Sequence, residues 1–106
     1  MKLIYAIVGD DDSHAVQSAL TRSGYSVTKL STTGGFLKVG NTTFIIGVED
    51  EKVDDVIDVI SKYCRKRSQL MPELSTYGGE YIPMPVEVTI GGATIFVTDV
   101  TQFEKL

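Results

Sequence analysis

The stretch that decides the fold is KLIYAIVGDDDSHAVQSALTRSG, residues 2–24. Residues 2–8 are apolar nearly throughout, which indicates a central strand covered on both faces. Residues 10–13 (DDDS) supply N-cap candidates and negative charge near a helix start. Apolar positions then recur at helical spacing from Val16, and Gly24 stands where a helix stop belongs. These residues predict a strand that runs directly into a helix.

The same pattern repeats further along the chain. Residues 25–31 and 42–48 predict a second and a third strand. A wide apolar stripe from Val53 to Cys64 predicts a second helix, and the basic residues 65–67 (RKR) complement the dipole at its end. The order is therefore β-α-β followed by β-α.

The last third of the chain is read as a loop and a hairpin. Residues 68–83 carry no clear periodicity and contain prolines and glycines, which predicts a long loop of functional importance. Residues 86–90 and 93–99 alternate between apolar and polar side chains. Because Gly91 and Gly92 join these two runs, we expect them to form a β-hairpin.

This order predicts an α+β fold in which residues 1–106 form a single domain. A ferredoxin-like βαββαβ sheet, with two helices on one face and an added C-terminal strand, accounts for the elements economically. Such a sheet leaves edges that need covering, and small proteins often cover them by forming oligomers.

Composition narrows the classes of function. The net charge of −4 disfavours nonspecific nucleic-acid binding, which depends on a basic footprint. One cysteine, Cys64, excludes an internal disulfide, and it falls on an apolar stripe as a small buried residue. The short apolar start has no cleavage-site pattern, so we expect a cytoplasmic protein without a membrane span.

Residues that would carry catalysis or bind a metal are few. A single histidine, His14, argues against a His-based triad or a His-rich metal site. The acidic residues 10–12 favour a helix start over a metal cluster, because consecutive residues in such a turn rarely converge. Known phosphate-loop, nucleophile-elbow and Cys/His metal spacings do not occur. We therefore expect neither an enzyme nor a metal or cofactor site.

Residues 29–44 (KLSTTGGFLKVGNTTF) carry the strongest functional signal. Gly34 and Gly35 can turn successive N–H groups towards an anion, and Phe36 offers a face for stacking. Gly47 weakens a strand unless something approaches closely there. These residues fit a small anionic ligand with a ring, such as a nucleotide, although a decorated connection between two strands has the same spacing.

Nearly the whole chain resembles the cyclic di-AMP receptor family of small PII-like signal transduction proteins. No single motif carries this resemblance; the combination does. Its parts are KLIYAIVGD (residues 2–10), TKL (28–30), TTGGFL (32–37), GNTTF (40–44), GV (47–48), YIPMPVEV (81–88) and GGATIFV (91–97).

The resemblance implies a ferredoxin-like homotrimer with cyclic di-AMP in each cleft between neighbouring subunits. One subunit would contribute Ser26, Val27, Thr28, Gly34, Gly35, Phe36, Leu37, Asn41 and Gly47, and Phe96 would come from the neighbour. Asn41 has the donor and acceptor that an adenine edge requires. Ser26 stands where members of the family often carry a basic residue, so it offers a phosphate a hydrogen bond at most.

The resemblance further implies that ligand binding orders residues 34–40 and 68–82 and so changes the binding of a downstream protein. Two other functions remain open. A nitrogen-type PII regulator of ATP and 2-oxoglutarate would need a long loop between the second and third strands, and that connection is short here. An acylphosphatase-like hydrolase would need an arginine in a glycine-rich loop beside the first strand, where Gly9 precedes three aspartates.

Overall fold

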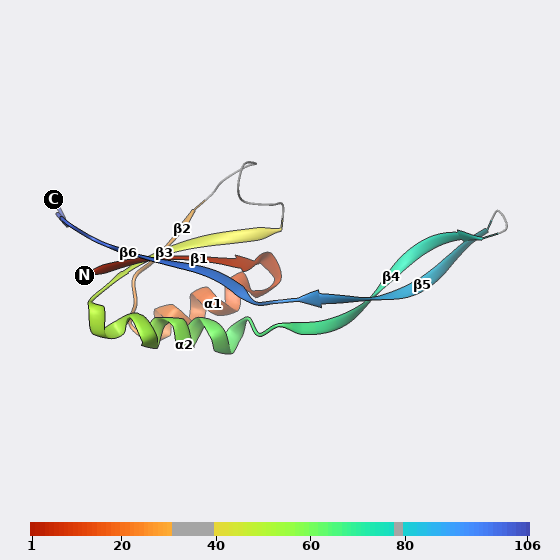
Figure 1. The fold of residues 1–106 in the computed structure, drawn as a ribbon, viewed down its shortest axis with the longest axis horizontal. Helices are drawn as coiled ribbons and strands as arrows, with labels where there is room; N and C mark the ends of the chain where they lie inside the picture. Colours follow the sequence, from red (N-terminus) through yellow and green to blue (C-terminus); the bar gives the residue numbers. More distant parts are fainter. Residues whose placement is uncertain (31–39, 78–79) are drawn as a thin grey trace.

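The structure, a computed structural model, describes residues 1–30, 40–77 and 80–106, with the backbone alone for residues 71–77 and 80–86. It has a compact body and a long two-stranded arm (Figure 1). The elements are β1 (Lys2–Gly9), α1 (Asp10–Arg22), β2 (Val27–Leu30), β3 (Asn41–Val48), a 3-10 turn η1 (Asp50–Lys52), α2 (Val53–Tyr63), β4 (Arg67–Tyr77), β5 (Glu80–Ile90) and β6 (Ala93–Asp99).

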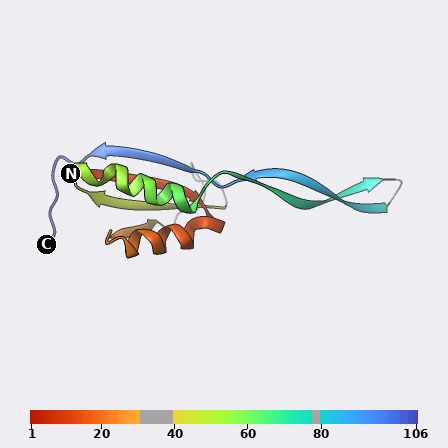
Figure 2. The same cartoon turned by 90° about the horizontal axis from the view of Figure 1, so that it is seen from below.

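The body is a four-stranded antiparallel sheet in the order β2-β3-β1-β6. Both helices lie on the same face of this sheet (Figures 1 and 2). This is the α+β arrangement expected from the sequence, and its strand order is that of a ferredoxin-like fold. The fourth place in the sheet belongs to β6 rather than to the strand that follows α2. The extra structure is therefore inserted before the last strand of the sheet, and the expected addition of a strand at the C-terminal end is wrong.

Alternation along the strands explains why the sheet has one covered face. On β1 the side chains of Ile4, Ala6 and Val8 are buried against the helices, whereas the residues between them are half-buried on the other side. Phe44 and Ile46 of β3 share the buried face. Coverage of the first strand on both faces, as its apolar run suggested, does not occur within the described chain.

Helix α1 ends as the sequence predicts. The amide of Gly24 donates to the carbonyl of Thr21 and that of Tyr25 to Leu20, while Gly24 adopts a φ of 91°. These two bonds form a Schellman motif, which glycine makes possible. The other end differs from expectation, since the N-cap is Gly9 and no side chain caps the helix. The acidic residues 10–12 lie inside the first turn, and their carboxylates are free for other partners.

Residues 68–83 do not form the expected loop. β4 and β5 pair along their whole length as a separate two-stranded sheet that extends away from the body (Figures 1 and 2). Prolines obscured this hairpin, but Pro72 faces Pro85 and Leu74 faces Pro83, so all of them fall in alternate pairs of the ladder. Every second residue pair in an antiparallel ladder is a non-hydrogen-bonded pair. A proline at such a pair removes no hydrogen bond from the ladder, so the hairpin can tolerate it.

The expected hairpin of residues 86–90 and 93–99 is also wrong. β5 pairs with β4, and β6 pairs with β1, so Gly91 and Gly92 stand at the root of the arm. Both adopt positive φ values, 87° and 80°, and the amide of Gly92 donates to the carbonyl of Cys64. The chain therefore turns at these glycines from the arm into the body.

Candidate functional site

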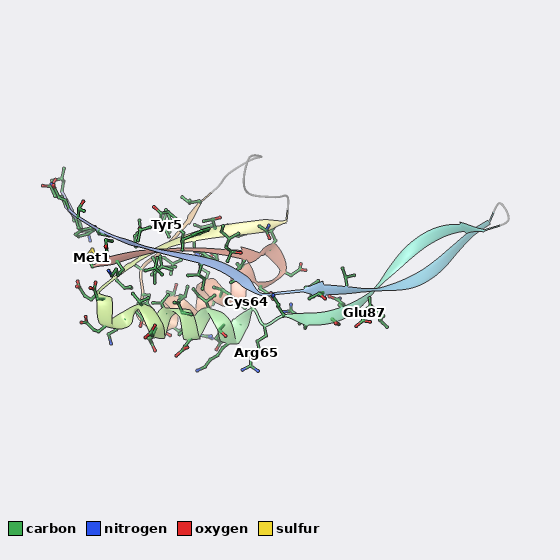
Figure 3. All side chains as sticks on the ribbon, viewed as in Figure 1. Met1, Tyr5, Cys64, Arg65 and Glu87 are labelled. Carbon is green, nitrogen blue, oxygen red and sulfur yellow. The ribbon has the colours of Figure 1, made fainter. Side chains whose placement is uncertain are left out.

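The face of the sheet opposite the helices is the first candidate surface. Residues that pair directly in an antiparallel sheet share a face. The register therefore aligns Thr28, Ile45, Tyr5 and Phe96 in one row across all four strands. Tyr5 points away from the helices (Figure 3), and Phe96 is 49% exposed. This face combines apolar rings and hydroxyl groups and has no helix over it. We call it the open face of the sheet.

The sequence-predicted residues fall into three groups. Thr28, Asn41, Gly47 and Phe96 lie on the open face, and Ser26 is exposed just before β2. Val27 lies on the opposite face, where it packs against the core, so a binding role for its side chain is not supported. Gly34, Gly35, Phe36 and Leu37 lie outside the described residues.

The four residues on the open face do not surround one compact pocket within a single chain. Asn41 and Gly47 are six residues apart on β3, which corresponds to roughly 20 Å along a strand. Phe96 lies at the opposite edge from Thr28, roughly 14 Å away across three strand spacings. A ligand that contacts Thr28 and Gly47 therefore cannot readily reach Phe96 of the same chain as well.

Gly47 has no structural reason to be glycine within the described subunit. It lies inside β3, opposite Leu3, with ordinary extended backbone. A Cβ atom placed there would meet nothing within 4 Å. Since glycine weakens a strand and leaves no side chain to pack, its presence on this open face points to a close approach from outside the subunit.

A cavity of about 670 Å³ lies at the end of the sheet where the arm joins the body. Its size is within the range of small-molecule sites. Asn41, the first turn of α1, Arg67 and the two glycines of the arm root line it. Of the sequence-predicted site residues that the structure describes, Asn41 alone lines this cavity, which therefore extends from the open face towards the arm.

One ion pair and one lysine define the charge at this end of the sheet. Arg67 donates to both carboxylate oxygens of Asp12, at 2.8 and 3.3 Å. This hydrogen bond raises the pKa of Arg67 above its usual value, so its positive charge is fixed. Arg67 is thus the first residue of β4 and a partner of α1, and the expectation that it complements the dipole of α2 is wrong. Lys66 lines the same cavity and adds a second cation.

Thr43 is a residue that sequence analysis did not single out. It is only 5% exposed, and its hydroxyl has no hydrogen-bond partner among the residues that the structure describes. The register places it between Leu30 and Ile7 on the open face, two residues from Asn41. An unsatisfied buried hydroxyl is unfavourable. Nothing in the local sequence distinguishes Thr43 from Thr42, whose hydroxyl is satisfied by Asp10.

Groups for catalysis or metal binding are sparse in the part of the chain that the structure describes. No cluster of three or more metal-ligating side chains occurs among those residues. His14 is exposed on α1. Cys64 is buried, its thiol donates to the carbonyl of Ile60, and burial raises the pKa of that thiol, so it is a poor nucleophile. Across the described residues, no helix is both long and apolar enough to cross a membrane.

The protein is a small α+β protein with a ferredoxin-like sheet, two helices on one face of that sheet and a cavity at its end. The chain belongs to the cyclic-di-AMP receptor family, whose model matches residues 1–106. The chain is also similar to a functionally unknown protein from Pediococcus pentosaceus known from a crystal structure. The two are 42% identical, the match covers 99% of this chain and 96% of that one, and the TM-score is 0.77. Family membership supports cyclic di-AMP as the ligand and a binding role in signal transduction rather than an enzymatic one.

Proposed function

We propose that this protein is a non-enzymatic, PII-like receptor that binds cyclic di-AMP between the subunits of a homotrimer and relays binding to a downstream protein. The ligand would lie on the open face of the sheet and reach towards the end cavity. Membership of the receptor family supports the ligand. The arrangement of the described residues supports the open face as the place where the ligand binds.

Gly47 is the observation that carries this proposal. The described residues of its own subunit leave the space beside it empty, so they alone would favour a β-branched residue there. A base or a neighbouring backbone that contacts β3 at this point would require glycine. An approach of the ligand or of a neighbouring subunit to β3 would therefore explain why position 47 is glycine.

The other expected contacts follow from chemistry and position. Asn41 is exposed at the start of β3 and has both a donor and an acceptor for an adenine edge. The exposed hydroxyl of Thr28 suits a phosphate oxygen. Phe96 offers a half-exposed ring for stacking, worth about 1–3 kcal/mol per base. Because its own Thr28 is far across the sheet, Phe96 would serve the site of a neighbouring subunit.

The relay would use the arm. β4 and β5 extend from the body at the cavity end, and two strands alone are marginally stable in water. A ligand at the arm root could therefore select one arrangement of the arm by its differential affinity for two states. A downstream protein would recognise that arrangement.

Calorimetric titration of variants with cyclic di-AMP tests this proposal. Gly47→Val should fold and keep its urea midpoint but lose binding, because its side chain fills space that the ligand needs. Phe96→Ala should bind about 10-fold more weakly, since a stacking contact of about 1–3 kcal/mol is removed. Val97→Ala is the matched control, because Val97 is similarly exposed on the other face of the same strand. Full binding by Gly47→Val would refute the placement on this face, and heat of binding from ATP instead would indicate a nitrogen-type regulator.

A further inference from the structure

The first turn of α1 holds both sides of Asn41. The backbone N–H of Asp10 donates to the carbonyl of Gly40 at 2.8 Å. The hydroxyl of Thr42 donates to Oδ1 of Asp10 at 2.5 Å. Since these partners are the residues before and after Asn41, Asp10 fixes the backbone that presents the Asn41 side chain.

The same helical turn holds the root of the arm. Asp12 is only 7% exposed and accepts two bonds from Arg67, which begins β4. Arg67 also donates to the carbonyl of Arg65 at 3.1 Å. That carbonyl lies so near Gly91 that it leaves no room for a Cβ atom there. A buried carboxylate needs such a partner, and the planar guanidinium provides a directional one. The position of β4 is therefore tied to α1 through one side chain.

The end cavity separates these two attachments. Gly40 and Asn41 line one side of it, and Arg67, Gly91 and Gly92 line the other. Space rather than packed side chains lies between Asn41 and the arm root. The hydrogen-bonded path through Asp10, the first turn of α1 and Asp12 is thus a direct mechanical connection between them.

We propose that this turn couples the ligand site to the arm, with Asp10 positioning Asn41 and Asp12 positioning β4. This coupling rests on the proposed function, because it assigns Asn41 to the ligand. A change in the orientation of the arm then changes how Asn41 meets the ligand, and ligand binding changes the arm by the same factor, since coupling between two sites is reciprocal. Three consecutive aspartates thereby acquire separate roles, and Asp11, which is exposed, has no hydrogen bond or ion pair among the described residues.

The test compares Asp12→Asn with Asp58→Asn, a change at an exposed residue of α2 that does not line the end cavity. Both variants remove one negative charge, but only the first disrupts the fork with Arg67. We expect the affinity for cyclic di-AMP, measured by calorimetry, to fall about 10-fold in Asp12→Asn, within the range typical of such coupling. Asp58→Asn should change it less than twofold. Equal affinities for the two variants would overturn the coupling. Arg67→Lys, which keeps the charge but not the fork, replaces Asp12→Asn if the latter has a lower urea midpoint.

A measurement without ligand separates the proposed coupling from the proposed function. Hydrogen exchange in the absence of nucleotide should become faster at the amides of residues 40–42 in Asp12→Asn, and remain unchanged there in Asp58→Asn. If the wild-type protein gives no heat with cyclic di-AMP but this difference appears, the proposed function is wrong and the mechanical connection stands. If exchange changes at the arm root alone and residues 40–42 are unaffected, the connection itself is refuted.

Discussion

Replacement of Gly91 by alanine should open the joint between the arm and the body. Gly91 has a φ of 87°, and a Cβ there would lie 2.9 Å from the carbonyl carbon of Arg65 and closer still to its oxygen. Those atoms are backbone, so no side-chain rotation relieves the overlap. Gly24 is the matched control, because its φ is 91° and a Cβ there would meet nothing within 4 Å.

The free energies of unfolding of the two variants should differ by the cost of the overlap between the new Cβ atom and the backbone of Arg65. A left-handed conformation costs a non-glycine residue about 1–2 kcal/mol, and the lower conformational entropy of the unfolded alanine variant offsets about 0.4–1 kcal/mol of that cost. Where strain is present, the net cost for Gly24→Ala is about 1 kcal/mol. Relief of the overlap at Gly91 would break the bond from Gly92 to Cys64, worth about 1 kcal/mol, and loosen the half-exposed Arg67 fork, worth about 1 kcal/mol. We therefore expect Gly91→Ala to cost about 3 kcal/mol.

Urea denaturation followed by circular dichroism measures both values. All samples should have the same protein concentration, because the stability of an oligomer depends on it. The loss for Gly91→Ala should exceed that for Gly24→Ala by about 2 kcal/mol. If the two losses agree within experimental error, the arm root is not the tight joint described above and the reasoning fails.

Two further predictions concern single groups. Thr43→Val should raise the free energy of unfolding of the ligand-free protein by about 1 kcal/mol, because it removes a buried hydroxyl that has no partner within residues 1–30, 40–77 and 80–106; a lower urea midpoint would show that the hydroxyl is satisfied in the folded protein. The N-terminal amine of Met1 lies 2.9 Å from Asp50, which raises the pKa of the amine from 8.0 and lowers that of the carboxyl from 3.8. Their stabilisation is therefore full between these two values, lost as pH falls through the lowered carboxyl pKa and lost as pH rises through the raised amine pKa. Urea titrations should show Asp50→Asn less stable than the wild type only inside that window, and a constant difference at every pH would contradict the assignment.

Local sequence signals predicted the body of the fold well. The apolar run of β1, the helical spacing in α1 with Gly24 at its end, and the stripe of α2 each depend on neighbours within a few residues. Such signals are legible in one sequence because the periodicity of a helix or strand is local. The arm was missed because its prolines resemble loop residues until the cross-strand register is known.

The site was less predictable from physics. Gly47 was singled out because glycine weakens a strand, whereas the site roles of Thr28, Asn41 and Phe96 came from the family resemblance. The structure places all four on one face. Val27 should have been separated from Thr28 at once, since adjacent residues of a strand point to opposite faces. The contact of Asp12 with Arg67 spans 55 positions and has no local signal.

The most direct test of cyclic di-AMP binding is a calorimetric titration of the purified wild-type protein. We expect saturable heat at one ligand per chain, from a homotrimer, and excess ATP should not abolish this heat. Absence of heat, or heat that ATP displaces completely, would contradict it.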